Sequence, residues 1–128
     1  MTARPASVTG GPDPADEAAI RRCIADYYDG YFTADPVRMR RALHPDLVKR
    51  SVGSGFVKTL SADDMVQFTA DGGGSDSSPA DRAWAVEALD VRGDIAAAVV
   101  ISTPFVDYVH LGRLAGMWQI VNVMWSNR

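Results

Sequence analysis

The sequence predicts an α+β domain in which helices come first and a mostly antiparallel sheet follows. Apolar residues repeat with helical spacing in the first third of the chain, and strand-like segments separated by two-residue turns at 93–94 and 115–116 fill the last third. A length of 128 residues is typical of one domain. We therefore expect a single domain over residues 16–128. Residues 1–15 are rich in Pro, Gly, Ser and Thr, and we expect a disordered tail there.

Three helices are predicted in the first half of the chain. The first spans residues 16–33, where apolar side chains recur three or four residues apart and so share one face. The second covers residues 35–43, because the aspartate that opens it is a good N-cap and Pro36 suits the first turn. The third follows Ser61, which together with Asp64 resembles a capping box.

Six strands complete the predicted fold, and a flexible glycine-rich loop over residues 72–79 separates the third helix from the last four of them. Pro104 interrupts the strand pattern, which suggests an edge position or a bulge. The strands are expected at residues 47–52, 56–60, 82–92, 95–103, 105–114 and 117–125.

The register of the last two strands predicts which of their residues share a face. If residues 115–116 form the turn, Leu114 pairs with Met117, and the other pairs follow by counting outward. One face would then carry Asp107, Val109, Leu111, Arg113, Trp118, Ile120, Asn122 and Met124. The other face would carry Tyr108, His110, Val121, Val123 and Trp125.

Both faces of this hairpin are largely apolar, although a solvent-facing side would normally alternate to polar residues. Three short helices suffice to cover only one face. We therefore expect a second copy of the chain to cover the face with Tyr108, His110, Val121, Val123 and Trp125, in a symmetric homodimer. The other face would border a cleft beneath the helices, where a small molecule can bind.

Composition argues against several other classes of protein. A net charge of −3 and a pI of about 5.2 argue against a general nucleic-acid binder. No apolar run approaches the roughly 20 residues that span a bilayer. The first residues also lack the apolar segment of a secretory signal, so we expect a cytoplasmic protein without membrane contact. A single cysteine and no Cys/His cluster predict neither an internal disulfide nor a metal site.

Several segments resemble the nuclear transport factor 2-like superfamily. They are the run His44-Pro-Asp-Leu-Val-Lys-Arg50, the glycine-rich loop, and the closing strands Asp107-Tyr-Val-His-Leu111 and Gly116-Met-Trp-Gln-Ile-Val-Asn-Val-Met-Trp125. Within the superfamily they are most similar to the branch called "putative lumazine-binding", which is related to SnoaL-like polyketide cyclases, and the resemblance covers about residues 16–126. It implies a cystatin-like roll, a cone-shaped barrel of three helices on a curved sheet. It also implies a pocket at the wide end, dimerisation through the outer sheet face, and chemistry without a metal or organic cofactor.

Two residues are candidates for catalysis. Asp107 is predicted to face the pocket beside Asn122, and burial among apolar side chains would raise its pKa and suit it to proton transfer. The alternative is an aspartate that only bonds nearby backbone at a strand end. His44 follows the second helix, so it could reach the pocket rim and pair with Asp107. The alternative there is a histidine held at a helix C-terminus, where the helix dipole favours it.

Five further residues are candidates for ligand binding: Tyr28, Tyr31, Arg50, Trp118 and Asn122. The two tyrosines come late in the first helix, although their spacing also fits plain core packing, as does that of Trp118. Lys49 and Arg50 are neighbours in a strand, so at most one of them can face the pocket. If Arg50 does, it would favour an anionic or carbonyl-bearing ligand. The alternative is solvated charge.

Two functions fit these residues. The first is a cofactor-independent lyase, isomerase or cyclase that moves a proton on a hydrophobic carbonyl or polycyclic substrate through Asp107. In it, His44 or a tyrosine of the first helix would polarise an oxygen. The second is a non-catalytic protein that binds a small molecule in the same pocket. The sequence alone does not decide between them.

Overall fold

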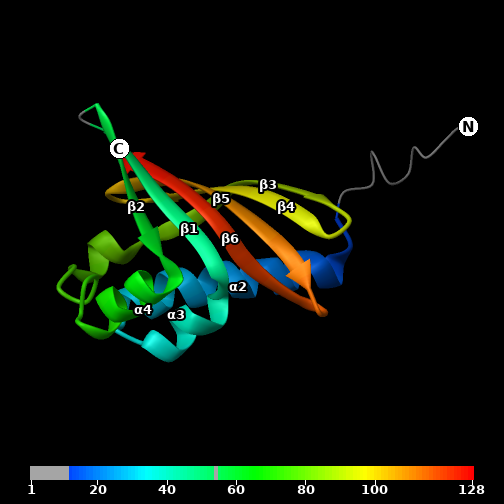
Figure 1. The fold of residues 1–128 in the computed structure, drawn as a ribbon, viewed down its shortest axis with the longest axis horizontal. Coiled ribbons are helices and arrows are strands. Elements are labelled where there is room, and N and C mark those ends of the chain that lie inside the picture. Colours follow the sequence, from blue (N-terminus) through cyan, green and yellow to red (C-terminus); the bar gives the residue numbers. More distant parts are fainter. Residues whose placement is uncertain (1–11, 54) are drawn as a thin grey trace, which may run out of the picture.

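A computed structural model describes residues 12–53 and 55–128 of the chain. Within them, three α-helices lie on one face of a six-stranded sheet, which confirms the predicted α+β class (Figure 1). The helices are α2 (Pro14–Phe32), α3 (Pro36–Ala42) and α4 (Ala62–Ala70), and a short 3-10 helix, η1, covers Pro79–Arg82. The strands are β1 (Leu43–Gly53), β2 (Phe56–Ser61), β3 (Trp84–Arg92), β4 (Ile95–Ser102), β5 (Phe105–Leu114) and β6 (Met117–Asn127).

The two shorter helices begin where local capping predicts. The Asp35 side chain accepts a hydrogen bond from the backbone of the first turn of α3, where Pro36 stands. α4 opens with a complete capping box, because the side chains of Ser61 and Asp64 each accept a bond from the other residue's backbone N–H. Both interactions join residues close in sequence, so the sequence alone is enough to predict them.

The first helix starts earlier than predicted. α2 begins at Pro14 rather than near Asp16, because the Asp13 side chain accepts hydrogen bonds from the backbone N–H groups of its first turn. The predicted tail is therefore shorter than expected at its C-terminal end. Its residues 1–11 lie outside the described part of the chain.

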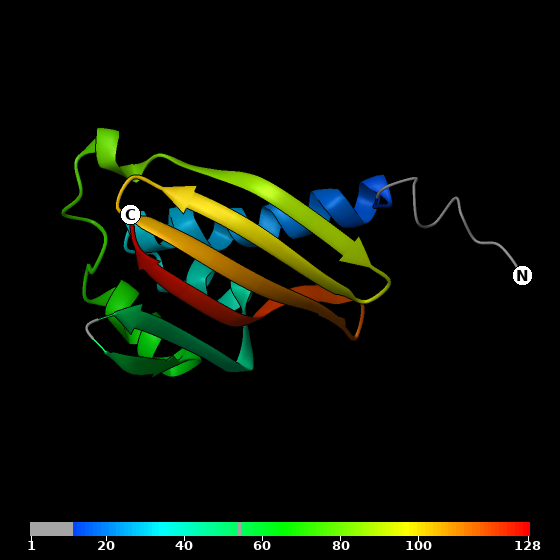
Figure 2. The same ribbon diagram turned by 90° about the horizontal axis from the view of Figure 1, so that it is seen from above.

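The sheet has the strand order β2-β1-β6-β5-β4-β3. Neighbouring strands are antiparallel except β1 and β6, which are parallel. In Figure 2 the long helix α2 crosses one face of the sheet, while α3 and α4 pack against the end formed by β1 and β2. We call this helix-covered side the inner face and the opposite side the outer face. The hydrophobic core lies between the helices and the inner face.

Two strands differ in extent from the prediction. β1 begins at Leu43, directly after α3, rather than at residue 47, and its pairing with β6 is irregular around Pro45, which has no backbone N–H to donate. β3 begins at Trp84 because the residues before it form η1. Pro104 lies in the bend between β4 and β5, so it separates two strands instead of bulging one.

The β5–β6 hairpin follows the predicted register only near its turn. Ala115 and Gly116 have φ of 51° and 77°, as a tight hairpin requires, and the predicted pairs Leu114 with Met117 and Leu111 with Ile120 are confirmed. Beyond that point the register shifts by one residue, and β6 contains one more residue than its partner, at Val121.

This bulge corrects the predicted faces of β6. Asp107 lies opposite Trp125 rather than Met124, and Val109 lies opposite Val123 rather than Asn122. The extra residue reverses every later side chain of the strand, because successive strand residues point to opposite faces. Val123 and Trp125 therefore point to the inner face, whereas Asn122 and Met124 point to the outer face. The shift places the fully buried Val123 in the core instead of the polar Asn122.

The outer face keeps large apolar side chains in contact with solvent. Ile95, Tyr108 and Met124 are 66%, 57% and 48% exposed, respectively. In the described residues, no helix is long and apolar enough to cross a membrane. The exposed apolar side chains show that the helices of this chain leave one apolar side of the sheet uncovered.

Candidate functional site

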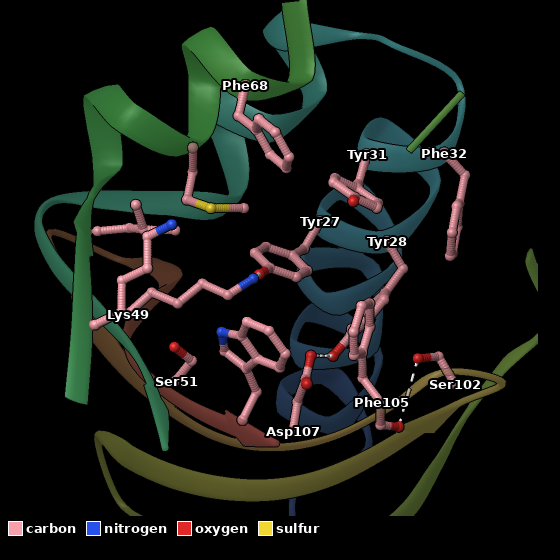
Figure 3. Close-up of a pocket in the computed structure, with 14 residues that line it drawn as sticks. Tyr27, Tyr28, Tyr31, Phe32, Lys49, Ser51, Phe68, Ser102, Phe105 and Asp107 are labelled. Carbon is pink, nitrogen blue, oxygen red and sulfur yellow. Dashed lines mark hydrogen bonds between the residues drawn. The ribbon is translucent and has the colours of Figure 1, made fainter. Parts of the chain in front are cut away.

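A cavity of about 290 Å³ lies at the C-terminal end of α2, between α2, α4 and the inner face of the sheet (Figure 3). Aromatic side chains form most of its wall: Tyr27, Tyr28, Tyr31, Phe32, Phe68, Phe105 and Trp125. The other lining residues are Lys49, Ser51, Lys58, Leu60, Met65, Ser102 and Asp107. An apolar cavity with a few polar groups on its wall is the usual form of a small-molecule site.

Asp107 is the buried carboxyl of this cavity. Its side chain comes from β5, it is 4% exposed, and the Tyr28 hydroxyl donates a hydrogen bond to its Oδ2 (Figure 3). Burial raises the pKa of Asp107, although the positive charge of Lys49 and the hydrogen bond from Tyr28 oppose the shift. A raised pKa makes a carboxylate a stronger base, which suits it to proton transfer.

Tyr28 is held in place by Trp84 at its ring and by Asp107 at its hydroxyl. Its ring stacks on Trp84 with 5.3 Å between centroids, and the Trp84 indole N–H donates to the Asp29 carboxylate over 3.0 Å. Burial raises the pKa of Tyr28 well above its usual range, and the nearby Asp107 charge adds to the shift. The phenol therefore stays protonated and keeps a proton to donate.

Lys49 is the half-buried cation of the cavity. Its side chain comes from β1, and Nζ donates a hydrogen bond to the Tyr27 hydroxyl over 2.6 Å (Figure 3). Nζ also lies 5.3 Å from the centroid of the Tyr27 ring and 5.6 Å from that of Trp125. Burial lowers the pKa of Lys49 to about 8, although the Asp107 charge opposes this.

The glycine-rich loop packs against Tyr31, which is one of the wall residues of the cavity. The Tyr31 hydroxyl donates to the Gly73 carbonyl over 3.3 Å. The backbone of Gly74 packs against the same ring so closely that an added Cβ would lie 2.3 Å from a ring carbon. This close approach requires glycine at position 74. The Tyr31 ring lines the cavity, and the Tyr31 hydroxyl binds the loop.

Three of the predicted site residues, Asp107, Tyr28 and Tyr31, are brought together in this cavity. The predicted partner of Asp107, His44, does not line it. The His44 ring turns back on its own strand, and its Nδ1 accepts from the backbone N–H of Asp46 over 3.0 Å. This corrects the predicted pairing, and the reason is that β1 starts immediately after α3 and directs the ring away from the cavity.

Arg50 and Asn122 lie on the outer face, which corrects both predictions of a ligand contact. Arg50 donates to the Asn122 carboxamide oxygen over 3.0 Å, and the Asn122 side chain lies 3.3 Å from Nδ1 of His110. Alternation along β1 sends Arg50 outward because Lys49 points inward. The bulge in β6 moves Asn122 to the same outer surface.

Trp118 lies near the start of α2, far from the cavity at the other end of that helix. Its indole N–H points to the Asp16 carboxylate at 3.4 Å, and the Arg113 guanidinium carbon lies 5.2 Å from the ring centroid. The predicted ligand contact of Trp118 is therefore wrong, and the alternative of packing describes its role. The reason is the position of Trp118 along the sheet. Trp118 shares the inner face with Asp107 but lies at the opposite end of that face.

The prediction from the sequence missed most residues of the cavity wall, and three of these carry polar groups or close the site: Tyr27, Lys49 and Trp125. Alternation in β1 narrowed the inward cation to Lys49 or Arg50 but could not choose between them. Trp125 was assigned to the wrong face because nothing local marks the bulge. Its indole N–H is buried and, among the described residues, has no hydrogen-bond partner. In that part of the chain, no group of His, Cys, Asp and Glu side chains is placed to hold a metal ion.

The architecture is shared with solved structures of the nuclear transport factor 2-like class. An NTF-2 like protein of unknown function from Silicibacter pomeroyi DSS-3 is 21% identical, with a TM-score of 0.77 over 89% of this chain and 97% of that one. A ketosteroid isomerase-like protein from Erwinia carotovora atroseptica SCRI1043 is 16% identical, with a TM-score of 0.66 over 90% and 98%. A domain with a cystatin-like fold from Nostoc punctiforme PCC 73102 is 13% identical, with a TM-score of 0.71 over 91% and 80%.

The sequence itself matches one protein family, whereas the fold is shared more widely. Residues 15–126 match the family described as "Putative lumazine-binding", so the chain belongs to that family. No curated protein is significantly similar to it. The resemblance found in the sequence is thus confirmed for this branch, and the fold is the one found in nuclear transport factor 2-like structures.

Proposed function

We propose that the protein binds a small hydrophobic carbonyl compound in this cavity and transfers a proton on it, as a lyase, isomerase or cyclase does. The observation that carries the proposal is the Asp107 carboxyl, which is buried in an aromatic cavity, has a raised pKa and is held by the Tyr28 hydroxyl. The similarity in fold to a ketosteroid isomerase-like protein supports the same class of chemistry. We also propose that sheet and helices form the cone-shaped barrel implied by the family, with the cavity at its wide end.

The size of the cavity limits the ligand. A buried apolar cavity of about 150 Å³ holds benzene. The cavity of about 290 Å³ therefore suits a ligand of one or two rings better than a larger polycyclic compound. The unpaired indole N–H of Trp125 is a further donor at the wall, and an acceptor atom on a ligand would satisfy it after a small adjustment.

In the proposed reaction, Asp107 takes a proton from a carbon next to the ligand's carbonyl group and returns it elsewhere. Tyr28 takes the polarising role that the sequence had offered to His44 or a tyrosine, because its hydroxyl stays protonated. Its one O–H donates to Asp107 in the free protein and turns to the carbonyl oxygen of the ligand when the ligand binds. The aromatic walls exclude water, which strengthens the interactions of Asp107 and Tyr28 with the ligand.

The alternative is a non-catalytic binding protein, and one observation favours it. Both buried charged groups already have a partner within the protein, Tyr28 for Asp107 and Tyr27 for Lys49. Such paired groups can position a ligand without transferring a proton to it.

A thermal-shift screen of aromatic and carbonyl compounds, with lumazine included because the family description names it, tests ligand binding first. A ligand at about 100 times its Kd stabilises the folded state by roughly 2.7 kcal/mol. Failure of every compound to stabilise the protein would contradict both functions.

Turnover of the stabilising compounds then separates the two functions. For the enzyme, Asp107→Asn should lower kcat by about 100-fold or more while the compound still stabilises the variant. The matched control Asp90→Asn changes an exposed carboxylate that pairs only with Arg92, and it should leave turnover unchanged. If no stabilising compound is turned over by the unsubstituted protein, the binding function stands instead.

We further propose that the protein is a homodimer through the outer face of the sheet. The support is that the helices cover only the inner face, whereas Ile95, Tyr108 and Met124 remain exposed on the other. Of the residues assigned to this contact from the sequence, Tyr108, His110 and Val121 remain candidates. Val123 and Trp125 point inward, so they are withdrawn from the contact.

A further inference from the structure

Lys49 is the one buried charged group of the cavity that proton transfer by Asp107 leaves without a role. Its side chain runs from β1 across the cavity and ends at the Tyr27 hydroxyl (Figure 3). The amine lies beside the rings of Tyr27 and Trp125, on the wall that a bound ligand would touch. A buried amine in an aromatic cavity is therefore available to whatever binds there.

No carboxylate of residues 12–53 and 55–128 lies within ion-pairing distance of Lys49 Nζ. Although the residue as a whole is half-buried, its amine ends against aromatic rings and not against a carboxylate. Burial instead lowers the pKa of Lys49 to about 8, so a substantial part of the amine is neutral near physiological pH. The neutral amine is the nucleophilic form, and desolvated lysines of this kind are the ones that react with carbonyl groups.

We propose that Lys49 forms an imine with the carbonyl carbon of an aldehyde or ketone bound in the cavity. The inference rests on the proposed function, since it names a covalent step for the carbonyl ligand of the same site. Nζ attacks the carbonyl carbon, a C–N bond forms, and the π electron pair moves to the oxygen. The two amine protons then leave with that oxygen as water, and a C=N bond remains, so no oxidant or reductant is needed.

The neighbours of Lys49 suit this reaction. The Tyr27 hydroxyl holds the amine in a fixed direction, and an oriented nucleophile reacts faster than a freely rotating one. The carboxyl of Asp107 lines the same cavity, where it supplies a proton to the departing hydroxyl and regains one that the amine gives up. The aromatic wall keeps out the water that would hydrolyse the product.

The chain allows an unusually clean test, because it contains only two lysines, Lys49 and Lys58. Both line the cavity, but Lys58 is exposed to solvent. The full-length protein is incubated near neutral pH with 2-naphthaldehyde and sodium cyanoborohydride, which reduces an imine to a stable amine. Intact mass and peptide mapping then give the adduct on each lysine and, separately, on the terminal amine. In the unsubstituted protein, we expect at least about ten times as much adduct on Lys49 as on Lys58.

This comparison needs no variant, so a folding defect cannot obscure it. Equal labelling of the two lysines, preferential labelling of the more exposed Lys58, or no lysine adduct at all would each overturn the imine. In addition, Lys49→Arg should abolish the preferential adduct, while the matched control Lys58→Arg should still form the adduct on Lys49. An adduct that survives Lys49→Arg in a folded variant would also overturn the proposal.

The proposed function can fail separately from the imine. 2-Naphthalenemethanol has the same rings but no carbonyl group, so it can occupy the cavity without reacting. If it stabilises the protein in a thermal shift while the aldehyde gives no preferential Lys49 adduct, binding stands and the imine falls. If it also slows the Lys49 adduct, reaction and binding occur in the same cavity, as proposed.

Discussion

Lys49 and Arg50 are neighbours in one strand, yet they occupy opposite chemical environments. Lys49 points to the inner face, where it is surrounded by aromatic rings and donates to a phenol. Arg50 points to the outer face, where it donates to Asn122 beside His110 in reach of water. The inner side of this sheet therefore borders an aromatic cavity and its outer side faces solvent, and a shift of one residue along the strand decides on which side a group lies.

The largest expected effect tests the register itself. Val123 is fully buried and Met124 is 48% exposed, the reverse of what unbroken pairing from the turn predicts. Val123→Asn should lower the free energy of unfolding by about 3 kcal/mol, because it buries an amide without partners and leaves a small cavity. Met124→Asn should lower it by less than about 1 kcal/mol. Urea unfolding of both variants measures this, and a larger loss for Met124→Asn would contradict the bulge.

The outer side of the comparison is tested through the oligomeric state. Tyr108→Asp places a charge at an exposed aromatic position of the outer face, and it should weaken the proposed dimer by about 2 kcal/mol or more. Sedimentation over a range of concentrations should show dimer for the unsubstituted protein and monomer for the variant. The control Asp63→Asn, on an exposed residue of α4, should remain dimeric. An unsubstituted protein that stays monomeric at micromolar concentration would contradict the dimer.

The inner cation has a predicted signature in the pH dependence of stability. The folded-state pKa of Lys49 is about 8, below the roughly 10.4 of an unfolded lysine, so the unfolded state binds more protons between these values. Stability attributable to Lys49 therefore rises with pH across this window and is lost as pH falls through about 8. Near neutral pH, Lys49→Met should be more stable than the unsubstituted protein by about 2 kcal/mol, and this advantage should shrink toward pH 10.4.

Denaturant midpoints at a series of pH values measure this difference. The control Arg50→Met removes the neighbouring cation from the outer face, and a guanidinium remains charged over the whole range. Its difference from the unsubstituted protein should therefore stay constant with pH. A constant difference for Lys49→Met as well would show that the amine is not buried as described.

The smallest effect is expected for the polar contacts of the outer face. Arg50 donates to Asn122 where both are accessible to water, so the bond replaces hydration of similar strength. Asn122→Ala should lower the free energy of unfolding of the monomer by less than about 1 kcal/mol. A loss of 3 kcal/mol or more would indicate that Asn122 is buried on the inner face after all.

Local features of the fold could be predicted from the sequence, and features that depend on distant contacts could not. The cap of α3 at Asp35, the capping box of Ser61 and Asp64, and the tight turn before Met117 were all predicted, because each involves residues close together in the chain. The cavity was predicted only in part. Asp107 was placed correctly because β5 has no bulge, whereas every predicted β6 contact beyond Val121 was reversed.

The sequence by itself determined the α+β class, the order of the elements and the presence of a buried carboxyl on the last hairpin, since periodicity and turn chemistry are local. Only the tertiary structure decided that Lys49 and not Arg50 faces the cavity, that His44 lies outside it, and that Trp125 forms part of its wall. The physical reason is that these outcomes depend on a bulge and on the burial of whole side chains. The fold selects them because the polar Asn122 then stays near water while Val123 enters the core.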